Sequence, residues 1–167
     1  MLFNYLHKIG WFVGLVFLQV LVLNHVNVGG YATPFLYVFF ILKAETDTSR
    51  NMLMLCAFLL GLLIDIFSDT PGMNAAATVW LAFVRPFVMH LFMPRDTNEM
   101  PVPSIRTMGV APFLKYVFFC VLLHHLLLFG IEYFSFAHIE TWLLHAGAST
   151  LLTTSCVMAL EGARKKR

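Results

Sequence analysis

Long apolar segments dominate the sequence and restrict what it can fold into. Hydrophobic residues make up 59% of the 167 positions and charged residues only 12%, against about 25% charged in an ordinary soluble domain. A soluble core cannot absorb this much apolar surface, whereas a bilayer can. We therefore predict an integral membrane protein that forms a single domain over residues 1–167.

Six apolar segments are separated by turns and charged loops, and a spanning helix needs about 20 residues. The predicted helices cover residues 9–28, 33–43, 51–67, 73–93, 112–134 and 139–161. The polar stretch 94–112 contains four prolines, so no regular domain is expected there. The segment 33–43 would cover only about 16 Å as a helix and is expected to be a tilted or spanning helix. The predicted fold class is all-α and polytopic.

Lysine and arginine predict which side of the membrane each loop faces, because cytoplasmic loops are enriched in both. If the N-terminus is cytoplasmic, six spans place ten of the eleven basic residues on the cytoplasmic side and none in the outside loops. These ten are Lys8, Lys43, Arg50, Arg95, Arg106, Lys115, Arg164, Lys165, Lys166 and Arg167. A different number of spans would scatter the charges. We therefore predict six spans with both termini in the cytoplasm.

Two charged residues, Asp65 and Arg85, lie inside predicted membrane helices. Small residues share a helical face with each, and such faces let helix backbones approach closely in lipid. The two faces consist of Ala57, Gly61 and Asp65, and of Ala75, Thr78, Ala82 and Arg85. The turn 68–72 joins the two helices, so we expect a close antiparallel hairpin with both charges turned toward protein.

Asp65 and Arg85 are not expected to pair with each other. Asp65 lies near the outer end of its helix, whereas Arg85 lies about 18 Å deep in the next one. Arg85 therefore needs another partner, such as backbone carbonyls freed by Pro86. A charge inside the membrane costs about 2.5–3.5 kcal/mol on the insertion scale. The two residues either lock the hairpin or bind a partner or ligand directly.

Other polar side chains in the predicted helices could form a metal, haem or ligand site, but the sequence favours structural roles for them. His124 and His125 suggest a metal or haem site, but adjacent helical residues point about 100° apart, and no metal or cofactor is expected. In the first segment, Gln19 and Asn24 either hydrogen-bond between helices or line an outward-facing ligand cavity. In the last segment, Ala146, Thr150 and Thr154 form a small-residue stripe that is expected to pack against a helix.

Catalytic patterns are missing from the sequence. It has no Gly-x-Ser-x-Gly element and no phosphate-cradling glycine loop, so we expect no enzyme and no catalytic residue. The three cysteines show no metal-ligand spacing. The basic residues are spread along the membrane edge, and no nucleic-acid site is expected.

Two stretches within about the first 95 residues carry the most specific motifs, LQVLVLNHVNVGGYATPFLYVFFIL and LLGLLIDIFSDTPGMNAAATVWLAFVRP. In the second, Gly61 and Asp65 form a G-x-x-x-D element, a turn leads to Gly72, and Arg85 follows. These stretches resemble the rod-shape-determining protein MreD family in its Bacteroidota-type form. The last two segments match it only in length and hydropathy. Gly61, Asp65, Gly72 and Arg85 are thus the candidate structural or partner-binding residues.

The resemblance implies a non-enzymatic scaffold in the bacterial inner membrane that serves the cell-elongation machinery. The family binds the membrane helix of MreC. Through MreC it connects MreB filaments to a RodA-type glycosyltransferase and a class B penicillin-binding protein. Its six-helix fold is similar to the substrate-binding S subunits of energy-coupling-factor vitamin transporters. An S-type subunit that binds a small molecule is therefore the alternative.

Overall fold

The chain folds into a bundle of helices in the computed structural model, which describes residues 2–93, 102–133 and 139–165. In chain order the elements are α1 (Leu2–Leu21), η1 (Leu23–His25), α2 (Val38–Leu42), α3 (Arg50–Ser68), α4 (Met73–Phe92), α5 (Ile105–Met108), α6 (Val110–Tyr133) and α7 (Ile139–Lys165). The all-α prediction is confirmed, and the described residues contain no named strand.

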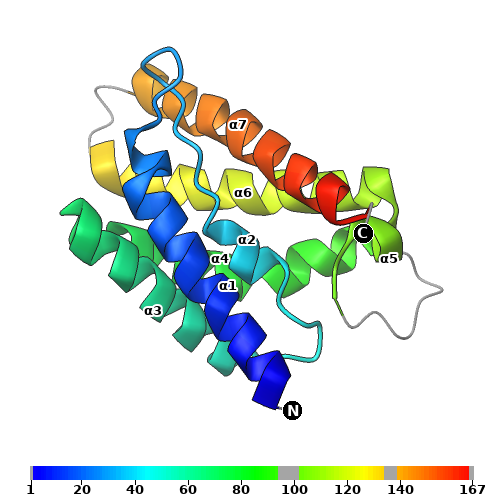
Figure 1. The fold of residues 1–167 in the computed structure, drawn as a ribbon. Helices are drawn as coiled ribbons and strands as arrows, with labels where there is room; N and C mark the ends of the chain where they lie inside the picture. The colour runs from blue at the N-terminus through cyan, green and yellow to red at the C-terminus, as the bar shows by residue number, and fades with distance from the viewer. Residues whose placement is uncertain (1, 94–101, 134–138, 166–167) are drawn as a thin grey trace.

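Four of these helices, α3, α4, α6 and α7, are long and apolar enough to cross a membrane. Helix α3 packs on α4, α4 packs on α6, and α6 packs on α7, while α1 lies against α3 (Figure 1). These apolar helices suggest a membrane protein, as the composition predicts. The predicted bounds of α3, α4, α6 and α7 agree with the structure to within a few residues, except that Phe134 lies outside the described part.

The first predicted helix, residues 9–28, is wrong at both ends. Helix α1 begins at Leu2 and ends at Leu21, and a single 3₁₀ turn follows it. The chain then reverses at Gly29 and Gly30, whose φ angles of 66° and 81° glycine adopts without steric cost. The polar side chains near the end of the helix form contacts that a continuous helix would not allow, as described below.

The second predicted helix, residues 33–43, is also wrong over its first half. The helix begins only at Val38, after a turn at Leu36 and Tyr37, and residues 33–35 have no regular structure. Pro34 disfavours a helical conformation at Thr33, so the proline that suggested a helix start here precedes an extended stretch instead. We call residues 26–44, which comprise this stretch, α2 and the two residues after it, the central segment.

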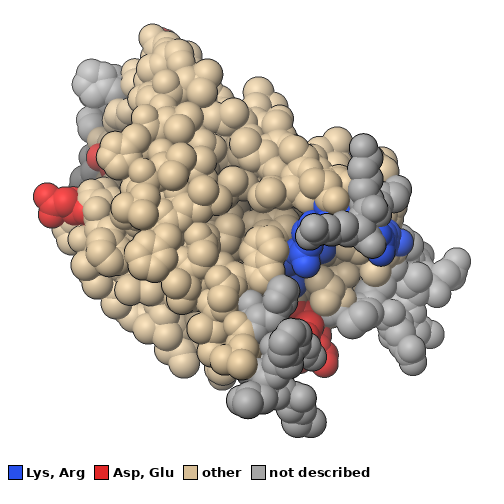
Figure 2. Space-filling model, viewed as in Figure 1, with Lys and Arg blue, Asp and Glu red and all other residues tan. Residues whose placement is uncertain are grey.

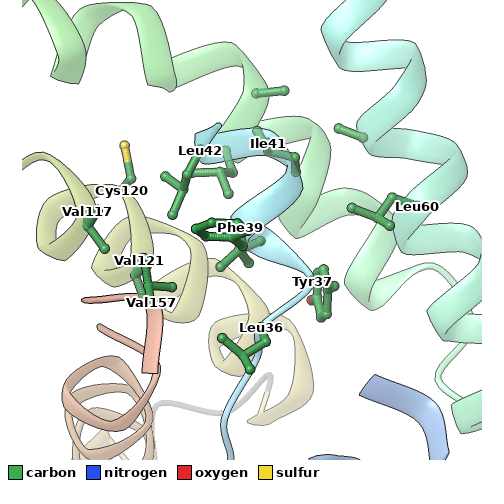
Figure 3. Close-up of a cluster of buried hydrophobic side chains, with 14 of the residues drawn as sticks. Leu36, Tyr37, Phe39, Ile41, Leu42, Leu60, Val117, Cys120, Val121 and Val157 are labelled. Atoms are coloured by element: carbon green, nitrogen blue, oxygen red, sulfur yellow. The ribbon is translucent and has the colours of Figure 1, made fainter. Parts of the chain in front are cut away.

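The central segment lies in the middle of the molecule. The side chains of Tyr37, Val38, Ile41 and Leu42 are completely buried. Figure 3 shows this part of the segment surrounded by Leu60 of α3, by Val117 and Val121 of α6, and by Val157 of α7. The core of the protein is therefore built around its shortest apolar segment.

The polar stretch 94–112 is described only from residue 102 onward. It contains the one-turn helix α5, which begins with a capping box in which Thr107 N donates to Ser104 Oγ and Ser104 N donates to Thr107 Oγ1. Such a box satisfies backbone donors that a helix leaves free.

Candidate functional site

The extended part of the central segment has backbone groups that no helix or sheet satisfies. Inside a bilayer such a stretch is tolerated only where protein surrounds it and its polar groups find partners. The structure supplies these partners as side chains, which come from α1 and α7. These contacts account for Gln19, Ser149 and Thr153 among the buried polar residues.

Gln19 of α1 supplies the first set of these contacts. Its Oε1 accepts a hydrogen bond from Leu36 N at 2.9 Å, and its Nε2 donates to Pro34 O at 3.0 Å. The same Nε2 donates to Asn24 Oδ1 at 2.9 Å, and Asn24 Nδ2 donates to Ser68 Oγ at 2.7 Å. Gln19 is fully buried. Its amide therefore satisfies backbone groups of the central segment, as a neighbouring strand would, and does not form the wall of an open cavity.

Helix α7 supplies the second set. Thr33 N donates to Ser149 Oγ at 3.2 Å, and Phe35 N donates to Thr153 Oγ1 at 3.0 Å. The predicted small-residue stripe stands beside these hydroxyls. One of its members, Thr150, lies 3.0 Å from Nδ1 of His125 on α6. The stripe thus faces α6, while the residues one position earlier hold the central segment.

Asp65 is buried at the turn between α3 and α4 and receives four hydrogen bonds. Its Oδ1 accepts from Thr70 Oγ1 at 2.9 Å, from Asn74 N at 2.9 Å and from Asn74 Nδ2 at 3.0 Å, and its Oδ2 accepts from Ala75 N at 2.9 Å. The first N–H groups of a helix lack partners within the helix and carry partial positive charge. The Asp65 carboxylate of α3 therefore caps α4.

Gly61 and Gly72 make this arrangement possible. A Cβ atom on Gly61 would lie 2.5 Å from Ala75 Cα and 2.5 Å from Thr78 Oγ1, so only glycine fits where α3 crosses α4. Thr78 Oγ1 also lies 2.8 Å from Ala57 O, to which it can donate across the same crossing. Gly72 has a φ angle of 82° and precedes α4 directly.

A chain of polar side chains continues from Asp65 toward α6. Tyr37 Oη donates to Asn74 Oδ1 at 2.7 Å and lies 3.2 Å from Nε2 of His124. Because the hydroxyl proton of Tyr37 is used on Asn74, we assign the shared proton of the second contact to Nε2 of His124. The cap of α4, the start of α2 and the middle of α6 are thus joined.

Arg85 lies at the opposite end of α2. Its Nε donates to Tyr116 Oη at 3.0 Å, its Nη2 donates to Ala44 O, and Tyr116 Oη donates to Leu42 O at 3.0 Å. The last carbonyls of a helix carry partial negative charge. The carbonyl that accepts from Arg85, Ala44 O, lies just after α2 and not, as expected, at the kink at Pro86.

The four candidate residues thus fall into two groups. Gly61, Asp65 and Gly72 meet at the α3–α4 turn, whereas Arg85 is about 15 Å further along α4, ten residues after Ala75. Both charged side chains are buried, with exposed fractions of 3% and 2%, as the sequence predicts. Each has its own partners, and those partners are backbone groups or uncharged side chains.

No protein-family model, curated protein or solved structure matches this chain. The site therefore has to be interpreted from its own contacts.

Sequence reasoning missed Tyr37 and Tyr116, whose hydroxyls join the two groups to the central segment. A repeat could have identified them, because the tetrapeptide YVFF occurs at both 37–40 and 116–119. A buried tyrosine in an apolar segment usually finds a hydrogen-bond partner for its hydroxyl. Ser149 and Thr153 could not have been assigned in this way, since their partners lie more than a hundred residues away in the sequence.

An ion pair lies at the end of the molecule that, according to the charge pattern, faces the cytoplasm. Lys43 Nζ donates to Glu161 Oε1 at 3.0 Å and to Pro103 O at 2.7 Å. The contact joins the end of the central segment to α7 and to the stretch before α5. Basic side chains gather at this end of the molecule, close to the C-terminus (Figure 2).

Proposed function

We propose that this chain is a non-enzymatic membrane scaffold of the cell-elongation machinery, similar to MreD, which binds the membrane helix of an MreC-type protein. The proposal rests on the hydrogen bonds of Asp65 and Arg85. Asp65 accepts from backbone N–H groups of its own chain, and Arg85 donates to a tyrosine hydroxyl and a backbone carbonyl of the same chain. Such residues build a fixed surface for a partner rather than a reactive centre.

The proposal includes six membrane crossings with both termini in the cytoplasm of a bacterial inner membrane. Four helices fit this requirement by length, and α1 and the central segment would supply the other two. The gathering of basic side chains at one end of the molecule supports this orientation, because cytoplasmic loops carry an excess of Lys and Arg. On this assignment the Asp65 turn faces outward and Arg85 lies in the cytoplasmic half.

The first experiment is a pull-down of the tagged chain from native membranes in mild detergent, with the bound proteins identified by mass spectrometry. We expect a single-span protein of MreC type together with a RodA-type glycosyltransferase and a class B penicillin-binding protein. Recovery of paired ATPases with a coupling subunit would contradict the scaffold and would support an S-type transport subunit instead.

Substitutions of Asp65 and Arg85 test whether these residues are needed for the proposed function. Asp65→Ala and Arg85→Leu are expected to abolish rod shape in cells that depend on the variant chain, because each loses the contacts that fix a helix end. Asp69→Ala is the control for Asp65, since Asp69 is exposed in the same turn. Arg50→Leu, an exposed arginine at the start of α3, is the control for Arg85. Normal cell shape with either test variant, at normal protein level, would contradict the assigned roles.

A further inference from the structure

A cavity of about 640 Å³ lies between α1, α2 and α3, beside the loop that follows the central segment. Pockets that bind small ligands usually measure about 300–1,000 Å³. None of the four candidate residues lines this cavity. It adjoins the contacts of Arg85, because Ala44, whose carbonyl accepts from Arg85, lines it.

The walls of the cavity are apolar. They include Phe12 and Leu15 of α1, Phe39 and Phe40 of α2, and Leu53 and Cys56 of α3. Ile9 and Met52, which also line it, have exposed fractions of 58% and 56%. The cavity thus opens between α1 and α3 on a surface whose apolar side chains would face lipid, so an acyl chain could enter sideways from the bilayer.

One end of the same cavity is polar. Lys43, Glu45, Thr48 and Arg164 line it there. The lining therefore carries two cationic groups and one acidic group. Lys43 already donates to Glu161 and to Pro103 O and has one of its three ammonium protons left.

Arg164 is the cation best placed for an incoming anion. Its guanidinium lies over the ring of Trp11, with Cζ 5.0 Å from the centroid, so a cation–π contact holds it at the cavity. Lys43 forms its ion pair with Glu161, and no ion pair between Arg164 and a carboxylate occurs among the described residues. Arginine suits phosphate because its planar N–H groups match the phosphate oxygens.

We propose that this cavity binds one anionic glycerophospholipid, with an acyl chain between α1 and α3 and the phosphate at Arg164. An apolar slot that opens to the bilayer and ends in a cation without an ion-pair partner in the described part of the chain fits the two parts of such a lipid. The side opening favours a lipid over a water-soluble anion. The proposal does not depend on the scaffold function.

Trp11 lines the cavity and serves as the reporter. The full chain, with Trp80→Phe and Trp142→Phe, is reconstituted in phosphatidylcholine vesicles that contain a low fraction of bromine-labelled lipid, which quenches nearby tryptophan fluorescence. Labelled phosphatidylglycerol is compared with labelled phosphatidylcholine of the same acyl chains. Since each basic group near the membrane surface favours an anionic lipid about fivefold, we expect half-maximal quenching at about fivefold less phosphatidylglycerol.

Matched variants separate the binding site from general attraction to the surface. Arg164→Gln is expected to remove the preference and Arg164→Lys to retain most of it. Arg50→Gln removes the same charge from an arginine that lies over Phe83 and Phe87, outside the cavity, and is expected to leave the preference intact.

A second pair of variants tests the acyl slot. Cys56→Phe fills the cavity and is expected to weaken quenching by phosphatidylglycerol, whereas Leu55→Phe changes an exposed neighbour that does not line it and is expected to have no effect. Equal quenching by both lipids in the parent chain would overturn the proposal, and would fit a groove for a partner helix. Equal loss in Arg164→Gln and Arg50→Gln would also overturn it.

Discussion

Asp65 is tolerated inside the protein because its charge is matched by aligned backbone dipoles instead of a cation. Its two oxygens accept from the first free N–H groups of α4 and from Thr70 and Asn74. Hydrogen bonds to a charged acceptor are roughly twice as strong as neutral ones. Asp65 thus caps the start of α4 and fixes the angle between α3 and α4.

Replacing Asp65 by Asn tests this assignment. The amide would direct an NH₂ group at backbone N–H groups, so we expect a loss of about 1–3 kcal/mol in the free energy of unfolding, measured by denaturant titration in detergent micelles. Asp69→Asn is the control, because Asp69 is exposed and has a left-handed φ of 55°, which asparagine also adopts. Equal stability of the two variants would contradict the capping role.

Two adjacent threonines on α7 offer a second test of a single hydrogen bond. Thr153→Val deprives Phe35 N of its acceptor and should cost about 1–3 kcal/mol. Thr154 is also buried, but its hydroxyl has no partner among the described residues, so Thr154→Val should cause no loss of stability. Unfolding of both variants in the same detergent gives the comparison. A larger loss in Thr154→Val would show that the central segment is held in another way.

The central segment reaches further than a helix of the same number of residues. Five of residues 33–42 form α2, and a turn at Leu36 and Tyr37 precedes it. Extended residues advance about 3.3 Å each and helical ones about 1.5 Å, so with residues 33–35 extended the ten residues reach about 20 Å instead of about 15 Å. The shortness of the segment, which argued against a full span, is thus partly offset by its extended residues.

The crossing of α3 and α4 depends on Gly61. Gly61→Ala would bring a methyl group against the backbone of Ala75, which cannot move without shifting the helix, so we expect a loss of about 1–3 kcal/mol. Gly14→Ala is the control, since a Cβ there meets nothing within 4 Å. Thermal unfolding in micelles followed by circular dichroism measures both variants. If Gly61→Ala unfolds at the parent temperature, the close crossing is wrong.

The long helices could be predicted from the sequence and the central segment could not. Helices α3, α4, α6 and α7 form their own backbone hydrogen bonds, so apolar length and turn residues suffice to locate them. The extended half of the central segment depends on Gln19, Ser149 and Thr153, and such distant bonds leave no local pattern. The same reason explains Arg85, whose burial could be predicted while its partners, Tyr116 and Ala44, lie far away in the sequence.

At the scale of the whole molecule, the polar side chains of the membrane region face inward and large apolar ones face outward. Among buried polar residues are Gln19, Asp65, Asn74, Arg85, His124, His125, Ser149 and Thr153, while exposed hydrophobic residues include Phe17, Leu59, Phe87, Leu91 and Leu151. A soluble protein has the opposite arrangement. The distribution therefore agrees with a surrounding bilayer.

Labelling of single cysteines tests the proposed crossing of the central segment. In a chain whose three native cysteines are replaced by alanine, Tyr31→Cys is expected to react with a membrane-impermeant thiol reagent on intact cells. Asp47→Cys is expected to react only after permeabilisation, because both residues are exposed and would lie on opposite sides. Glu140→Cys should behave like Tyr31→Cys. Reaction of Tyr31→Cys and Asp47→Cys from the same side would contradict the six-span topology.

The dependence of the central segment on α7 also sets an order of events during biosynthesis. Thr33 and Phe35 leave the ribosome more than a hundred residues before Ser149 and Thr153, which accept their N–H groups. Until α7 has been inserted, the extended stretch has no acceptors there and stays with water or with an insertion factor. We therefore expect the interior around the central segment to be completed only when α7 takes its place.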